Sequence, residues 1–185
     1  MTGSSLPLFR QTVRPEWIDY NGHMSEAFYV LVFGHATDTM MDAVGLDPAY
    51  RERSGCSLYT VEAHVRYLKE VPEGTPLAVR TRILGVDGKK LRFAHEMYAG
   101  EAADGQEAEQ DTAEQDTAGQ DTAGQDSAGQ DGGAEAVATI ELFALHVGAQ
   151  GSAPFPEPVR ERLSALLEEP PAWAGRAIGP VPRAV

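Results

Sequence analysis

One long apolar segment constrains the fold of this 185-residue chain more than any other feature. Residues 25–44 (SEAFYVLVFGHATDTMMDAV) predict a single helix that ends at Gly45, with Pro48 shortly after it. Its apolar side chains cover more than one stripe, which is typical of a helix packed on several sides rather than of a surface helix. The remaining elements are therefore expected to surround this helix.

Most of the remaining chain favours β-structure. Runs of β-branched and aromatic residues, in part alternating with polar ones, predict strands at 6–13, 57–68, 76–85, 90–99 and 136–147. Asp87-Gly88 between two of these runs is a strong hairpin signal. Residues 156–169 carry apolar side chains at helical spacing and predict a second helix, and the Pro/Gly-rich residues 170–185 predict a flexible tail.

This order predicts an α+β fold in which one antiparallel sheet wraps around one long buried helix, the outline of a hotdog fold. We take residues 1–169 as a single domain. Uncovered sheet edges and an apolar helix surface favour a homodimer, and whether dimers pair into tetramers stays open.

Residues 101–135 interrupt this pattern with a low-complexity acidic repeat. They hold 11 acidic residues and no Lys or Arg, and they repeat a Gln-Asp-Thr/Ser-Ala unit every five residues in their central part. Such a composition cannot offset the entropy of ordering, so we predict a disordered insert in a hairpin loop. A longer loop adds little to the entropy of closure, and the fold is expected to survive without it.

Charge and composition exclude several classes of function. Outside the insert, 17 acidic residues face 15 basic ones, which gives no basic field for nucleic acid. No run is long enough for a membrane span. The first residues lack a signal peptide and Cys56 has no partner within the chain, so we expect a cytoplasmic protein.

The densest group of chemically capable side chains lies at residues 15–26, between the first strand and the long helix. It holds Asp19, Gly22 and His23 beside a helix N-terminus, where free amides and the helix dipole can hold a developing oxyanion. The same residues could form a plain turn, with Asp19 or Ser25 as a helix cap. Spacing alone favours the plain turn.

The segment Asp19-Tyr20-Asn21-Gly22-His23-Met24, with Tyr29 six residues after His23, resembles the Asp-x-x-Gly-His signature of hotdog acyl-CoA thioesterases of the 4-hydroxybenzoyl-CoA thioesterase type. Residues 13–46, 59–68, 77–93 and 139–147 are similar to the betainyl-CoA thioesterases of bacterial carnitine catabolism. Ser25-Glu26 departs from the Asn-Asn found in many members, which puts the role of those side chains in doubt.

The resemblance implies hydrolysis of a short acyl-CoA thioester, with betainyl-CoA as the favoured substrate and neither cofactor nor metal. Asp19 matches the acidic residue that attacks the carbonyl or activates water, and His23 is assigned beside it. Two alternatives stay open: a thioesterase for another small or aromatic acyl-CoA, and a non-catalytic module that binds acyl-CoA. The residues expected to bind substrate are Trp17, Asn21, Gly22, Tyr29, Tyr59, Thr60, Glu62 and His64.

Three details of this site are expectations about side chains. Strict alternation along residues 59–64 would put Thr60, Glu62 and His64 on one face. A betainyl group carries a quaternary ammonium, which aromatic faces and negative charge recognise. Trp17 and Tyr59 are the first choices for it, and the full set of candidates is Trp17, Tyr20, Tyr29, Tyr59 and Tyr67, with Glu62 as the counter-charge. The candidates for the CoA phosphates are Arg66, Lys69, Lys89, Lys90 and Arg92.

Overall fold

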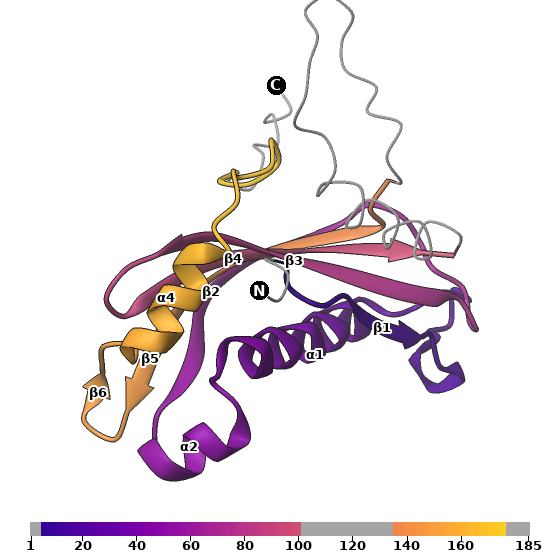
Figure 1. Cartoon of the computed structure of the whole chain (residues 1–185). Helices are drawn as coiled ribbons and strands as arrows, with labels where there is room; N and C mark the ends of the chain where they lie inside the picture. The colour runs from indigo at the N-terminus through magenta and orange to yellow at the C-terminus, as the bar shows by residue number, and fades with distance from the viewer. Residues whose placement is uncertain (1–4, 101–134, 177–185) are drawn as a thin grey trace, which may run out of the picture.

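The computed structural model describes residues 5–100 and 135–176. Figure 1 shows a curved sheet arching over one long helix. In chain order the elements are β1 (Phe9–Thr12), the 3-10 helix η1 (Pro15–Trp17), α1 (Glu26–Val44), α2 (Pro48–Ser54), β2 (Ser57–Tyr67), β3 (Pro76–Val86), β4 (Lys90–Ala99), β5 (Ala138–Gly148), β6 (Gly151–Ser152) and α4 (Glu157–Ala165).

The strands form one antiparallel sheet in the order β1-β3-β4-β5-β2, with β6 paired to β5. The Asp87-Gly88 hairpin is confirmed, because Asp87 Oδ1 accepts hydrogen bonds from the amides of Lys89 and Lys90 at 2.9 Å. β4 and β5 are paired neighbours, so the acidic insert connects two adjacent strands, and its residues 101–134 lie outside the described residues. The α+β arrangement of a sheet wrapped around α1 is confirmed.

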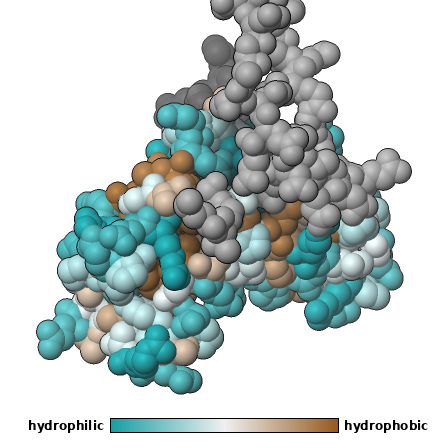
Figure 2. All heavy atoms as spheres, in the orientation of Figure 1, coloured by the Kyte–Doolittle hydropathy of each residue, from teal (hydrophilic) through white to brown (hydrophobic). Residues whose placement is uncertain are grey.

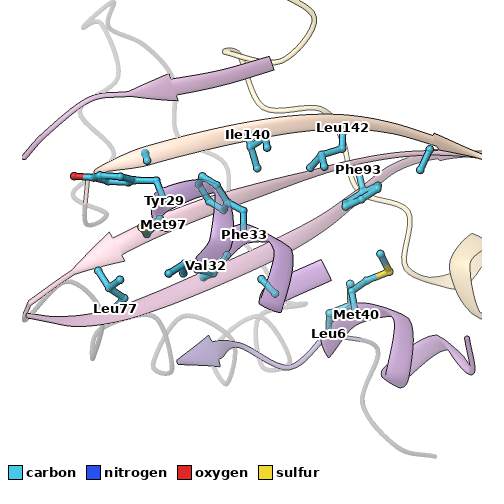
Figure 3. Packing of buried hydrophobic residues seen from close by; sticks show 14 of the residues in the cluster. Leu6, Tyr29, Val32, Phe33, Met40, Leu77, Phe93, Met97, Ile140 and Leu142 are labelled. Carbon is cyan, nitrogen blue, oxygen red and sulfur yellow. The ribbon is translucent and has the colours of Figure 1, made fainter. Parts of the chain in front are cut away.

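The core lies between α1 and the concave face of the sheet. Figure 3 shows side chains of α1, among them Val32 and Phe33, pointing toward Leu77, Phe93 and Ile140 of three neighbouring strands. The opposite face of α1 leaves Val30 and Leu31 44% and 42% exposed. The prediction that this helix packs on several sides is therefore wrong for the single chain, because the sheet covers only one face of α1.

One buried histidine fastens α1 to the sheet. His95 of β4 is fully buried, and its Nε2 and Nδ1 each lie 2.9 Å from a threonine hydroxyl, of Thr37 on α1 and Thr81 on β3. The ring stacks on Phe33 with centroids 5.9 Å apart. Burial lowers the pKa of His95 to about 3, so the imidazole stays neutral at physiological pH.

The short helix α2 is not predicted by the sequence pattern. Pro48 follows the end of α1 and was interpreted as a stop signal, but it also occupies the first turn of α2, where proline is tolerated. The preceding Asp47 caps this helix, because its Oδ1 accepts a hydrogen bond from the amide of Tyr50 at 2.6 Å. The Tyr50 hydroxyl lies 2.9 Å from Nε2 of His146, which joins α2 to β5.

The C-terminal segment crosses the outer face of the sheet, the face turned away from α1. α4 is shorter than predicted, and after it Leu167 bridges Ile83 at the uncovered part of the β3 edge. Trp173 Nε1 then donates to Glu96 at 3.1 Å, and the amide of Gly175 donates to Glu141 at 2.6 Å. Residues 170–176 thus contact the sheet, whereas the rest of the expected flexible tail lies outside the described residues.

Apolar side chains also reach the surface in places. Figure 2 shows brown apolar patches among teal hydrophilic residues on one face of the molecule. Large apolar or aromatic side chains that are at least 40% exposed are Tyr20, Val30, Leu31, Tyr59, Val61, Tyr67, Leu68 and Leu167. Most of these residues lie on α1 or β2 or directly follow β2, so the edge strand β2 and the outer face of α1 are the least covered elements.

Because His95 is buried in its neutral form, we expect the free energy of unfolding to decrease as the pH is lowered. The unfolded chain takes up a proton near 6.5, the ordinary pKa of histidine, whereas the folded chain does so only near 3, so stability is lost as the pH falls below 6.5. The expected contribution is about 1.4 kcal/mol per pH unit between about pH 6 and 4. Urea unfolding across this range should give a shallower slope for His95→Gln, which does not titrate. Equal slopes for the two proteins would contradict the assignment.

Candidate active site

The Asp-x-x-Gly-His segment folds into a tight turn between η1 and α1. Ile18 and Met24 form an antiparallel bridge, and the amide of Asp19 donates to the His23 carbonyl at 3.0 Å. Gly22 has a φ of 85°, a left-handed conformation that favours glycine. The Met24 amide donates to the Val71 carbonyl at 2.8 Å, so the turn is fixed to the segment that follows β2.

Asp19 is partly buried, and its carboxylate stabilises the turn. Oδ1 accepts a hydrogen bond from the Asn21 amide at 2.7 Å, and Oδ2 lies 3.5 Å from the Asn21 side-chain nitrogen. This is the plain-turn geometry that spacing favoured, but Asp19 caps the turn and not the helix. Oδ2 has only the longer contact, so it keeps capacity to accept a proton or contact a substrate.

His23 lies opposite Asp19 in the turn and faces Glu70. Its Nδ1 is buried and lies 3.4 Å from Oε2 of Glu70, without the alignment of a hydrogen bond. A buried nitrogen without a good hydrogen-bond partner is costly unless another group satisfies it. The position suits a residue that orients the loop and contacts a bound group.

The first turn of α1 follows the loop directly. Ser25 occupies the N-cap position, but its side chain makes no capping hydrogen bond to the described residues. The first amides of a helix have no partner within the helix and carry its partial positive charge. The Phe28 amide donates to the Ser25 carbonyl at 3.0 Å. The amides of Glu26 and Ala27, which make no hydrogen bond to the described residues, therefore remain available to hold negative charge that develops beside the Asp19 loop.

Trp17 anchors the loop instead of offering a free aromatic face. Its ring is 4% exposed and stacks on Phe28 with centroids 5.4 Å apart and planes 14° apart. The Arg14 guanidinium carbon lies 5.4 Å from the same ring. The Trp17 carbonyl also accepts the Ser25 amide at 2.9 Å. These contacts position η1 against α1, so Trp17 is poorly placed to hold a quaternary ammonium.

A pocket of about 350 Å³ lies between the start of α1 and the end of β2. Tyr29 is 3% exposed, and its hydroxyl donates to the Lys69 carbonyl at 3.1 Å. Its ring meets Tyr67 edge-on, with centroids 5.4 Å apart and planes at 81°. Burial raises the pKa of Tyr29. The residues around this pocket are Met24, Glu26, Tyr29, Tyr67, Leu68, Lys69 and Glu70.

Strict alternation along β2 is wrong, because the strand contains a bulge. The register shifts between Thr60 and Glu62, so Val61 is an extra residue. Thr60 pairs with Ala144 of the core face, whereas Glu62 and His64 pair with Phe143 and Glu141 of the outer face. The predicted face shared by Thr60, Glu62 and His64 does not exist.

Tyr59, Glu62 and His64 therefore lie on the outer face, away from the Asp19 loop in the single chain. Tyr59 pairs with Leu145 and is 53% exposed. Glu62 and His64 border a second pocket of about 450 Å³, which also includes Arg92, Phe143 and Arg176. This pocket is larger, but none of the residues around it belongs to the Asp19 loop or to α1. We therefore take the smaller pocket as the candidate substrate site, because it borders the Asp19 loop and the start of α1.

Most of the predicted phosphate-binding residues have partners within the chain. Lys69 pairs with Glu135 at 2.6 Å and Arg92 with Glu141 at 2.5 Å. Lys90 lies 3.7 Å from Asp87, and Lys89 Nζ donates to the Ser152 hydroxyl at 2.9 Å. Arg66 is partly buried on the outer face, opposite Thr139. These residues do not converge on the Asp19 loop.

Comparison with known families decides the class of this site. The thioesterase-like superfamily matches residues 13–163, which include the loop, α1 and the whole sheet except β1. The chain belongs to this superfamily. The resemblance to hotdog thioesterases seen in the sequence is confirmed, and so is the hotdog fold.

Related proteins and structures agree with this membership. The chain is 38% identical over 181 residues to the betainyl-CoA thioesterase of Pseudomonas aeruginosa, with 94% of each chain covered. It is 32% identical to the L-carnitine dehydrogenase/betainyl-CoA thioesterase of Rhizobium meliloti, where the match covers 94% of this chain but 30% of that longer protein.

Two solved structures share the thioesterase-like fold. A Pseudomonas putida KT2440 protein, solved as a candidate thioesterase, is 35% identical, with a TM-score of 0.66 and coverage of 95% of this chain and 96% of that one. A Staphylococcus aureus protein in complex with CoA has a TM-score of 0.72 at 22% identity, with 95% and 94% covered. The second similarity shows the fold alone.

The structure brings together only part of the predicted site. Asp19, Asn21, Gly22 and His23 share the turn, and Trp17 and Tyr29 flank it. Glu26 and Glu70, which border the pocket beside Tyr29, are not among the site residues predicted from the sequence. Glu26 is the second residue of the predicted helix and the first residue of α1, a position at which a ligand-facing carboxylate could have been suspected. Glu70 belongs to no sequence motif that would have pointed to a site.

Proposed function

We propose that the chain hydrolyses a short acyl-CoA thioester and that betainyl-CoA is its substrate. The observation that carries this proposal is the turn that holds Asp19 directly before the uncapped N-terminus of α1, within a thioesterase-like fold. The names of the relatives from Pseudomonas aeruginosa and Rhizobium meliloti support betainyl-CoA as the acyl donor. The products are betaine and free CoA.

The residues of the loop support a simple mechanism. The Asp19 carboxylate either attacks the thioester carbon or removes a proton from the water that attacks it. The carbonyl oxygen gains negative charge, which the first amides of α1 stabilise. The carbon–sulfur bond then breaks, oxygen from water stays on the acyl carbon, and the CoA thiolate takes up a proton.

The other loop residues prepare this geometry. Gly22 lets the main chain take its left-handed turn, and the amide of Asn21 holds Oδ1 of Asp19. His23 orients the loop through its carbonyl and faces Glu70 with its ring. Tyr29 closes the pocket beside them. Tyr59, Thr60, Glu62 and His64 are left out of the proposed mechanism, because the register of β2 places three of them on the outer face.

We also propose that the active protein is a homodimer formed through β2. This eleven-residue strand lies at the edge of the sheet, and no described strand pairs with its free side. Val61 on β2 and Val30 and Leu31 on α1 are 55%, 44% and 42% exposed. An unpaired edge beside exposed apolar side chains is the surface that a second copy would cover.

We also propose a cytoplasmic location, since a chain with the single cysteine Cys56 does not depend on a disulfide of its own and is typical of reducing compartments. Among residues 5–100 and 135–176, the structure contains no helix of the length and hydropathy that crossing a membrane requires.

Replacing Asp19 by Asn tests the chemistry. We expect kcat for betainyl-CoA to fall by roughly 10²- to 10⁴-fold, because the amide can neither attack nor accept the proton, while binding of betainyl-CoA persists. Thiol release and calorimetric binding measure the two effects. Asp42→Asn, at an exposed position near the other end of α1, is the matched control and should keep wild-type turnover. A wild-type protein that binds but releases no thiol is instead a non-catalytic acyl-CoA-binding module.

Replacing Val61 by Lys tests the dimer. A charge on the bulge of β2 should raise the dimer dissociation constant at least roughly ten-fold, because the lysine would have to be desolvated at the interface. Leu167→Lys is the control, since Leu167 is similarly exposed at 49% but bridges β3 at the other side of the sheet. Sedimentation velocity should show dimers for wild type and Leu167→Lys. A monomeric wild-type protein would refute the proposal.

A further inference from the structure

We propose that the pocket between Tyr29 and Tyr67 binds the quaternary ammonium group of the acyl chain. The four residues that carry this role are Tyr29, Tyr67, Glu26 and Glu70, and we call them the tyrosine pocket. The inference rests on the proposed function, because only a cationic acyl group requires such a site. It assigns substrate selection to residues other than Trp17 and Tyr59, the aromatic side chains that the sequence favoured.

The two tyrosine rings form a corner. Their planes stand at 81° with centroids 5.4 Å apart, and both residues border the pocket. Tyr67 is 46% exposed and offers most of the accessible aromatic surface, whereas Tyr29 is buried and packs against it. Hydrogen bonds hold both rings. The Tyr29 hydroxyl donates to the Lys69 carbonyl at 3.1 Å, and the Tyr67 hydroxyl donates to the Glu26 carbonyl at 3.5 Å. The corner therefore exists before any ligand binds.

Two carboxylates complete the pocket. Both Glu26 and Glu70 border the pocket, and they come from two different segments: Glu26 begins α1, and Glu70 lies in the connection that follows β2. Lys69 also borders the pocket, but its ammonium group pairs with Glu135 at 2.6 Å. The local balance of charge is therefore negative, which favours a cation over a neutral or anionic group.

A trimethylammonium group fits this chemistry. It donates no hydrogen bonds, so aromatic faces and negative charge are the means by which proteins recognise it. The volume of about 350 Å³ leaves room for the small acyl group together with part of the chain that carries it.

The tyrosine pocket is joined to the catalytic loop. Met24 borders the pocket and is paired to Ile18, the residue before Asp19. Glu70 faces Nδ1 of His23 at 3.4 Å, and His23 lies opposite Asp19 in the turn. The betainyl group has one methylene between its nitrogen and its thioester carbon, so the cation site and the carboxylate that acts on the thioester must be close neighbours.

Other aromatic residues are less suitable. The ring of Trp17 already contacts Phe28 and the Arg14 guanidinium, and the positive charge of Arg14 would repel a cation. Tyr59 lies on the outer face of the sheet, paired with Leu145. Tyr20 is 96% exposed and has no aromatic neighbour among the described residues.

The test compares two substrates that differ only in charge. In 3,3-dimethylbutanoyl-CoA a carbon atom replaces the nitrogen of betainyl-CoA, so shape is kept and the positive charge is lost. We expect wild type to prefer betainyl-CoA in kcat/KM, and Glu26→Gln and Tyr67→Leu each to reduce this preference roughly ten-fold. Glu73→Gln, an exposed glutamate in the same connection as Glu70 but outside the pocket, should leave the preference unchanged.

Binding measured in the Asp19→Asn background separates this proposal from the proposed function. There, calorimetry gives the ratio of dissociation constants for the two CoA esters without turnover, and adding Glu26→Gln should reduce that ratio by a similar factor. Equal binding of the two esters, or a ratio that Glu26→Gln and Tyr67→Leu leave unchanged, overturns the tyrosine pocket. Absence of thiol release by wild type overturns the hydrolase, while the binding ratio still decides the pocket.

Discussion

The packing of one face of α1 against the concave side of the sheet is the constraint on which the rest of the structure depends. Phe33 and Val32 lie among side chains of three strands, and His95 fastens the same helix to β3 through two threonine hydroxyls. Because the helix cannot move along the sheet, its N-terminus is fixed beside the end of β2. The Asp19 turn is thereby placed next to the unpaired amides of Glu26 and Ala27, and Tyr29 meets Tyr67 across two elements that are distant in sequence.

Much of this fold could be predicted from the sequence, because its elements follow local patterns. The apolar helix, the alternating strands and the Asp87-Gly88 hairpin depend on residues close together in the chain. Where a local signal had two meanings, the prediction failed: Pro48, interpreted as a signal after the end of α1, is the first residue of α2, whereas Gly45 is the residue that ends α1. The bulge at Val61 could not be read from β2 alone, since it depends on pairing with β5.

The candidate site likewise contains residues that a local motif predicts and residues that only the fold brings together. Asp19, Gly22 and His23 were selected as candidates because they lie close together in the chain and resemble a known signature, and in the structure they share one turn. Residues that were selected for their aromatic or acidic character alone have other surroundings in the structure than expected. Trp17 packs against Phe28, and the bulge places Glu62 on the outer face. Glu70 could be found only from the fold, because its contact with His23 joins two segments that no local pattern connects.

The most direct test of the account is the release of free CoA by wild-type protein from betainyl-CoA, acetyl-CoA and 4-hydroxybenzoyl-CoA measured side by side. The Asp19 carboxylate beside the start of α1, with a negative aromatic pocket next to it, predicts thiol release from all esters that fit, with the highest kcat/KM for betainyl-CoA. A preference for 4-hydroxybenzoyl-CoA or acetyl-CoA would contradict the assigned substrate, and no release from any of the three would contradict thioester hydrolysis itself.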